Sequence, residues 1–169
     1  FTSLDFLLFF LLWELELIPM FFLISIWGTG RKEYSAMKFL IFTIAGSAFM
    51  LVGILALFFS SGTFDMTMLP SVIQTTTLIL PSGLIFAFLL VGFAVKLPVW
   101  HLHSWLPDAH TDAPYACSVM LAGVLIKMGG YGIIRVCATI FPEVMSDMAW
   151  LIAGAGLINI LYGAIVTFS

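Results

Sequence analysis

Charged residues are scarce in this 169-residue chain. Only 9% of its residues are Asp, Glu, Lys or Arg, whereas 62% are hydrophobic. Soluble domains contain roughly a quarter charged residues, so a water-soluble fold could not bury this much apolar surface. The formal net charge is -3 and no basic patch occurs, which argues against a nucleic-acid partner.

Groups for redox and nucleotide chemistry are also few. The two cysteines, Cys117 and Cys137, lie about 30 Å apart on one predicted helix, too far for a disulfide. No Gly-rich phosphate loop, nucleophile elbow or iron-sulfur cysteine set occurs in the sequence. We therefore expect this chain to hold no cofactor and to do no redox chemistry itself.

Long apolar runs dominate what is present. Five follow one another, over residues 6–27, 36–60, 78–100, 116–140 and 148–168. A helix needs about 20 apolar residues to cross a bilayer, and the alternating pattern of a membrane barrel is absent. The sequence predicts an all-α membrane protein of about five transmembrane helices. Because the connections are short, we expect residues 1–169 to form one membrane domain.

The chain ends and the loops add two expectations. The chain begins at Phe1, without an initiator Met or a signal peptide, and stops at Ser169 inside an apolar run, so we expect a fragment. Arg31, Lys32 and Lys38 gather at the first connection, and such residues favour the cytoplasmic side. The first and third connections are therefore predicted to face the cytoplasm or its equivalent.

Four charged residues lie within the apolar runs: Glu14, Glu16, Lys96 and Lys127. Each costs about 2.5 to 3.5 kcal/mol at the centre of a membrane helix, so such groups normally pair or line a wet path. One interpretation is a structural ion pair, for example between Glu14 and Lys96. The other is a proton relay, because buried Glu and Lys can both exchange protons near neutral pH.

The two glutamates are predicted to differ in role. Glu14 and Glu16 point about 200° apart around a helix, so they cannot both meet the same lysine. Pro19 removes the hydrogen bond to the Leu15 carbonyl and leaves an extra polar acceptor near both carboxyls.

The segment 95–107 is the least regular apolar stretch. Pro98 interrupts it close to Lys96, and a discontinuous helix beside an ionisable group is a common ion site in transporters. The alternative is an ordinary helix end with Trp100 and Trp105 at the membrane interface.

Three histidines and two acids follow this segment: His101, His103, His110, Asp108 and Asp112. Their spacing fits no zinc pattern, so we expect no metal. Histidines at a proton entry, or hydrogen-bonded to loop carbonyls, are the favoured interpretation.

Several motifs together resemble one family: WELELIPM (13–20), KLP (96–98), HSWLPDAH (103–110), AP (113–114) and LAGVLIKMGGYG (121–132). The family is the antiporter-like M-type membrane subunit, also called chain 4, of complex I, the NAD(P)H:quinone oxidoreductase. The family has both respiratory and photosynthetic members. The resemblance covers essentially the whole chain in one register.

The resemblance implies helices five to eight and the start of nine of a fourteen-helix fold with inverted repeats. It implies a proton relay of Glu14, Lys96 and Lys127, with Lys96 on a broken helix. A second acid at the position of Glu16 is similar to what photosynthetic and cyanobacterial members of the family have. His101 stands where the family usually has a second proline.

The resemblance also implies a setting. The complex would couple electron transfer to quinone with proton pumping, in a bacterial plasma membrane, a thylakoid or an organelle inner membrane. Its other subunits would hold NAD(P)H or ferredoxin, quinone, flavin and iron-sulfur clusters. The partners would be other membrane subunits of complex I, including neighbouring antiporter-like ones, together with lipid and protons.

Two alternatives stay open. The first is a subunit of a multisubunit cation/proton antiporter or of a membrane-bound hydrogenase. The second is a structural membrane scaffold in which the charges only lock helices together.

Overall fold

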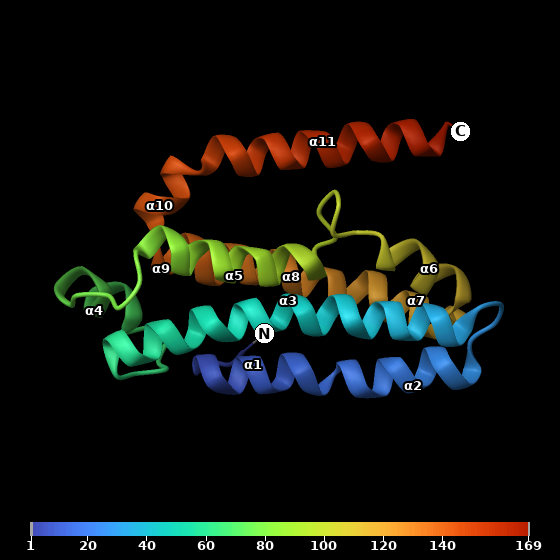
Figure 1. The fold of residues 1–169 in the computed structure, drawn as a ribbon, viewed down its shortest axis with the longest axis horizontal. Coiled ribbons are helices and arrows are strands. Elements are labelled where there is room, and N and C mark those ends of the chain that lie inside the picture. The colour runs from blue at the N-terminus through green and yellow to red at the C-terminus, as the bar shows by residue number, and fades with distance from the viewer. Residues whose placement is uncertain (1, 169) are drawn as a thin grey trace.

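The computed structural model describes residues 2–168, and helices that run alongside one another dominate it (Figure 1). The N-terminal part consists of α1 (Phe6–Leu15), α2 (Leu17–Trp27), α3 (Lys32–Ser61), α4 (Leu69–Thr75) and α5 (Ser82–Lys96). A short helix follows, α6 (Trp105–Asp112). One long helical segment is then built from α7 (Tyr115–Met120), η1 (Leu121–Leu125), α8 (Ile126–Gly132), η2 (Ile133–Cys137) and α9 (Ala138–Ile140). The chain finishes with α10 (Pro142–Asp147) and α11 (Ala149–Thr167).

The predicted membrane crossings are confirmed, with one shortened. Among residues 2–168, four helical segments are long and apolar enough to cross a membrane: Phe6–Trp27, Lys32–Ser61, Tyr115–Ile140 and Ala149–Thr167. The third predicted crossing, 78–100, is wrong at both ends because its helix, α5, has only 15 residues. Pro81 precedes that helix and Pro98 follows it, and proline interrupts helical hydrogen bonding.

Helices α3 and α5 pack closely against each other through glycines. A Cβ atom added to Gly46 would lie 2.8 Å from Cβ of Val95. One added to Gly92 would lie 2.6 Å from Cβ of Met50. Because these positions lack side chains, the two backbones approach closely, and α5 is held against the middle of α3.

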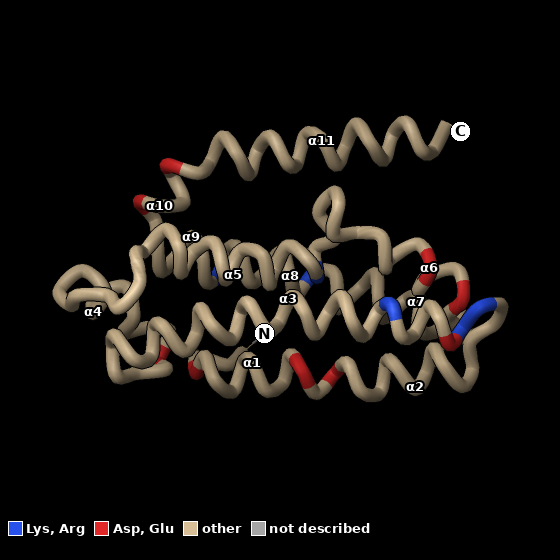
Figure 2. Tube along the Cα trace, viewed as in Figure 1, with Lys and Arg blue, Asp and Glu red and all other residues tan. Residues whose placement is uncertain are grey.

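Polar contacts join the α2–α3 turn to α6 at one end of the bundle. The backbone N–H of Thr29 donates to the Asp112 carbonyl at 2.8 Å. The Ser35 hydroxyl donates to the Asp112 carboxylate at 2.5 Å, and Lys38 pairs with Asp108 at 2.7 Å. The first and third connections therefore lie at the same end, as predicted. Most charged residues lie near the ends of the bundle, and few lie at its middle (Figure 2).

Helix α11 stands apart from the other long helices (Figure 1). None of its residues is buried. It meets the segment after α5 at two places: Asn159 Oδ1 accepts the backbone N–H of Trp100 at 2.7 Å, and the rings of His103 and Tyr162 lie 5.0 Å apart. The irregular segment after α5 is therefore one place where α11 touches the bundle, and Ile152 near the start of α11 packs against the hydrophobic core at another.

Candidate functional site

The first membrane crossing is interrupted at its middle. Helix α1 ends at Leu15 and α2 begins at Leu17, so Glu16 occupies the junction. Pro19 has no N–H to donate to the Leu15 carbonyl, and the N–H of Met20 reaches the Glu16 carbonyl only at 3.4 Å. The predicted single helix over 6–27 is thus two collinear pieces, and Glu16 lies where the helical hydrogen bonding is weakest.

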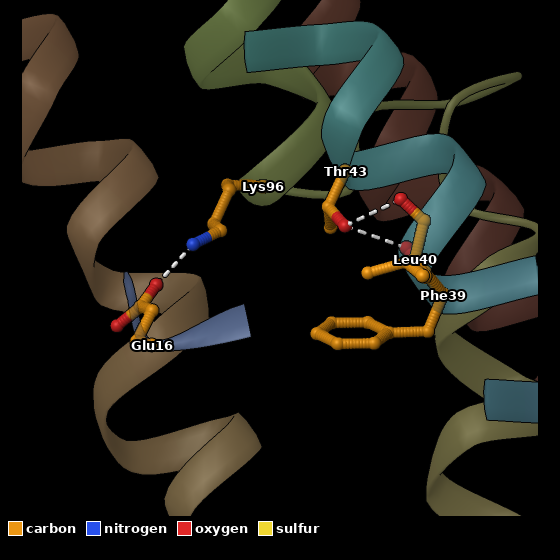
Figure 3. Close-up of polar contacts among 5 residues, drawn as sticks. All are labelled: Glu16, Phe39, Leu40, Thr43 and Lys96. Atoms are coloured by element: carbon orange, nitrogen blue, oxygen red, sulfur yellow. Dashed lines mark hydrogen bonds and ion pairs between the residues drawn. The ribbon is translucent and has the colours of Figure 1, made fainter. Parts of the chain in front are cut away.

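Lys96 pairs with Glu16 at this junction. The Lys96 ammonium, on the last residue of α5, donates a hydrogen bond to Glu16 Oε1 (Figure 3). Lys96 is only 1% exposed, so the carboxylate compensates a charge that has almost no contact with solvent or lipid. The predicted pairing of Glu14 with Lys96 is therefore wrong for this structure, because the carboxylate that meets the lysine is Glu16.

Two aromatic side chains, Trp13 and Phe93, lie beside the Lys96 ammonium and its neighbours. Lys96 Nζ lies 4.4 Å from the ring centroid of Trp13, a cation–π distance. The Trp13 ring in turn meets Phe93 of α5 edge-on, with centroids 5.6 Å apart. Sequence reasoning missed Trp13, although Trp13 and Glu16 are spaced i, i+3 and so share a helix face.

Glu14 lies on a different side of the same crossing. Its Oε1 is buried and has no hydrogen-bond partner among residues 2–168. Glu14 lines a groove of about 380 Å³, whose other lining residues are Leu11, Leu15, Leu17, Ile18, Leu40 and Ile44. Among residues 2–168, the carboxylate that the Lys96 ammonium binds is therefore that of Glu16 and not that of Glu14.

The break after Lys96 has its own hydrogen bonds. Pro98 cannot donate to the Ala94 carbonyl, and the N–H of Val99 donates there instead at 3.0 Å. The indole N–H of Trp105 donates to the Val95 carbonyl at 3.0 Å. Helix α6 then lies beyond the end of α5 along the bundle (Figure 1). The predicted discontinuous helix is confirmed, and its freed carbonyls are satisfied within the chain.

The three histidines do not form one cluster. His101 is exposed and has a φ of 74°, a left-handed conformation that is uncommon for a residue with a side chain. His103 Nδ1 is buried without a hydrogen-bond partner in the described part of the chain. His110 lies on α6, where its carbonyl accepts the Ser118 hydroxyl at 3.3 Å. Within residues 2–168, no group of three or more His, Cys, Asp or Glu side chains is placed to hold a metal.

Lys127 lies between two π-helical turns, η1 and η2, and its side chain is exposed. No hydrogen bond or ion pair joins it to another described residue. The backbone beside it is nevertheless close to Lys96, because a Cβ added to Gly129 would lie 2.7 Å from the Leu97 nitrogen. The structure thus brings the helices of the two lysines together while the side chains remain apart.

Known proteins of one membrane family match this chain over nearly its whole length. Residues 3–169 match the family described as NADH:quinone oxidoreductase/Mrp antiporter, TM. The chain is 46% identical over 168 residues to NAD(P)H-quinone oxidoreductase chain 4 1 of Synechococcus sp. (strain JA-2-3B'a(2-13)), covering 99% of this chain and 32% of that protein. It is 46% identical over 171 residues to NAD(P)H-quinone oxidoreductase chain 4, chloroplastic, of Cryptomeria japonica, covering 99% and 34%. The chain therefore spans about a third of the length of these relatives.

A solved structure shares the fold. A chain of respiratory complex I from Thermus thermophilus with bound NADH superposes with a TM-score of 0.84 at 28% identity. The superposition covers 98% of this chain and 35% of that chain. The fold of this chain, which includes the interrupted helices and the buried Lys96, therefore also occurs in a respiratory complex.

Proposed function

Because this chain belongs to the NADH:quinone oxidoreductase/Mrp antiporter membrane family, we propose that it moves protons across the membrane as part of an NAD(P)H-quinone oxidoreductase. The chain is an integral membrane protein. We propose that it is one membrane domain of a longer subunit. Electron carriers, namely NAD(P)H or ferredoxin, flavin, iron-sulfur clusters and quinone, would be held by other subunits of the complex.

The ion pair between the buried Lys96 and the half-buried Glu16 carries the proposal. Both residues lie where a helix is interrupted, at the α1–α2 junction and at the end of α5. Interrupted helices at ionisable groups are typical of transport sites, because unwound backbone can supply polar groups without a separate loop. A pair built only for stability would not need both of its members at helix ends.

The chemistry follows from the charge states of the pair. With Glu16 as carboxylate and Lys96 as ammonium, the pair is neutral overall and stable. When the pair opens, Lys96 loses its stabilising partner and passes one proton onward, becoming a neutral amine. A proton from the entry side then restores the ammonium. We propose Lys127 as the next acceptor, and His101, His103 and His110 as groups on the entry side.

The test is the substitution Lys96→Met in the full-length subunit within the intact complex. Met keeps much of the side chain's length but cannot carry a proton, so we expect quinone-driven proton uptake by membrane vesicles to fall to background. Lys32→Met serves as the control, because Lys32 lies outside the pair and its ammonium donates to the Ile26 carbonyl at 2.8 Å. Proton uptake at the wild-type rate in an assembled Lys96→Met complex would refute the proposal.

The alternatives predict other outcomes. The family also includes Mrp antiporters, and membership of a cation/proton antiporter would show as proton movement driven by a sodium gradient without quinone reduction. A membrane-bound hydrogenase subunit would instead require hydrogen evolution by the complex. In a purely structural scaffold, a Glu16→Gln, Lys96→Met double variant would assemble and pump normally.

A further inference from the structure

Helix α11 has few polar residues, and two of them meet the irregular segment after α5, residues 97–104. Asn159, the chain's single asparagine, and Tyr162 are spaced i, i+3 and so share a helix face. Asn159 Oδ1 accepts the backbone N–H of Trp100 at 2.7 Å. The Tyr162 ring lies 5.0 Å from the ring of His103. Since an asparagine in an apolar membrane helix normally serves to bind another segment, this face of α11 is built to hold the irregular segment.

The Trp100 N–H is a donor that the helix break sets free. In a continuous helix it would donate to the carbonyl four residues earlier, that of Lys96. Helix α5 ends at Lys96, and Asn159 Oδ1 is the acceptor instead. Because an unpaired N–H inside a membrane is strongly unfavourable, Asn159 stabilises the irregular form of the segment over a continuous helix.

The other hydrogen bonds of the break come from nearby residues. The N–H of Val99 donates to the Ala94 carbonyl. The Trp105 indole donates to the Val95 carbonyl, 10 residues away. Asn159, by contrast, lies 59 residues from its donor. This side chain therefore joins the break to a distant element, whereas the other two bonds join it only to its own surroundings.

A strained residue lies between the two contacts with α11. His101 has a φ of 74°, a conformation that is unfavourable for a residue with a Cβ atom. Such strain persists only where the surrounding structure fixes the backbone. Trp100 directly precedes His101 and His103 follows it, so α11 holds the chain on both sides of the strained residue.

The position of α11 depends on few contacts with the described helices. None of its residues is buried, so close packing does not fix the helix over its length. Ile152 near its start packs against the hydrophobic core, and Asn159 and Tyr162 lie further along. A displacement of α11 at these two residues would therefore act on the backbone beside Lys96 rather than on the core.

We propose that Asn159 is a positioning residue that holds the segment after Lys96 in its irregular form, and that α11 thereby controls the backbone beside this lysine. While Asn159 binds it, the Trp100 N–H has an acceptor and the strained turn at His101 is supported. When α11 withdraws, both lose that support and the segment rearranges next to Lys96. The inference rests on the proposed function, to which it adds a residue and a regulatory helix outside the ion pair.

The direct test is hydrogen exchange in the full-length subunit within the intact complex. Asn159→Leu nearly keeps the side-chain volume but has no acceptor. We expect backbone exchange over residues 97–104 to become about tenfold faster, the effect of losing one hydrogen bond. Thr167→Val is the matched control, because the Thr167 hydroxyl donates within α11, to the Gly163 carbonyl at 2.7 Å. Unchanged exchange in Asn159→Leu, or an equal rise in both variants, would overturn the inference.

Rescue by a second amide separates positioning from packing. Asn159→Gln keeps an amide oxygen on a longer, flexible side chain, so we expect it to retain more than half of the proton-pumping rate. Asn159→Leu should pump about tenfold more slowly at equal assembly. Equal losses in the two variants would count against an acceptor role. If leucine prevents assembly, Asn159→Ala is measured in the same way, with the same expected loss and the same contrary result.

The Lys96→Met variant separates this inference from the proposed function. Pumping at the parent rate in Asn159→Leu, together with none in Lys96→Met, would remove the role of α11 and leave the proposed function standing. Normal pumping in Lys96→Met would instead remove the proposed function. The exchange rate over residues 97–104 would still decide whether Asn159 holds the segment.

Discussion

Gly129 brings the helix of Lys127 against the end of the helix that carries Lys96. A Cβ at this position would lie 2.7 Å from both the Leu97 nitrogen and the Phe93 carbonyl oxygen. Backbone atoms cannot rotate away as a flexible side chain can, so the two helices would have to separate. The smallest residue is therefore required here by the close approach of two backbones.

A Gly129→Ala substitution should destabilise the protein by about 1 to 3 kcal/mol, the usual cost of overpacking. The measurement is the thermal midpoint of the purified complex in detergent, which should fall. Gly123→Ala is the matched control on the same helical segment, because nothing lies within 4 Å of a Cβ there and alanine favours helix over glycine. Equal midpoints for the two variants would contradict this account.

The choice between Glu14 and Glu16 shows what sequence could predict at the residue scale. The cost of intramembrane charge singled out both acids and both lysines as groups that need partners, and among the described residues Lys96 and Glu16 meet one another. It could not choose the partner of Lys96, because residues that face outward in α1, such as Leu8 and Leu12, are as apolar as the buried ones. Without a polar face, periodicity does not indicate which side of the helix is buried.

At the scale of elements, α6 is fixed to α3 by Asp112. Its carboxylate accepts the Ser35 hydroxyl, and its carbonyl accepts the N–H of Thr29. Gly30 adopts a φ of 61°, and a Cβ there would lie 2.5 Å from Asp112 Oδ1. The C-terminal end of α6 is therefore held against α3 through Asp112. The N-terminal end of α6 follows the irregular segment that contains His101.

Replacing this carboxylate should loosen α6. In Asp112→Ala we expect faster backbone hydrogen exchange over residues 97–112, because Ser35 loses its acceptor and α6 loses a side-chain anchor. Hydrogen exchange with mass spectrometry on the intact complex would measure the change. Asp147→Ala, which removes an exposed acid on α10, should leave exchange over 97–112 unaltered; an equal increase in both variants would rule out the anchoring role.

Element boundaries were predictable where a single residue type decides them. Pro98 predicted the break after α5, and that break is present. Pro19 predicted a lost hydrogen bond at the Leu15 carbonyl, but the division of the first crossing at Glu16 was not predicted. The short helices α4, α6 and α10 were not predicted, since each lies in a connection and has no apolar run of membrane length. The π-helical turns around Lys127, η1 and η2, were not predicted from the sequence.

For the whole molecule, the two ends of the bundle differ in charge. The end that contains the α2–α3 turn has Arg31, Lys32 and Lys38. The loops at the opposite end contain Asp65, Glu143 and Asp147. Because positive loops remain on the cytoplasmic side, the turn between α2 and α3 is predicted to face the cytoplasm or its equivalent.

Single cysteines can test this orientation. A membrane-impermeant maleimide added outside intact cells should label Thr76→Cys, at the end of α4, and should leave Glu33→Cys unlabelled until the membrane is opened. Both positions are exposed. The native Cys117 and Cys137 are buried, so the parent chain should stay unlabelled and provides the control. The reverse labelling pattern would invert the topology.

The brevity of α5 has a consequence for how the protein is made. Its 15 residues reach only about 22 Å, less than the roughly 30 Å of a bilayer's hydrocarbon core, and its last residue is a lysine. Such a segment would be a poor candidate for insertion into lipid alone. Glu16 precedes Lys96 by 80 residues, so it leaves the ribosome first and can already be in the membrane when Lys96 arrives. The ion pair would then act during biosynthesis as the partner that draws a short, charged helix into the bilayer.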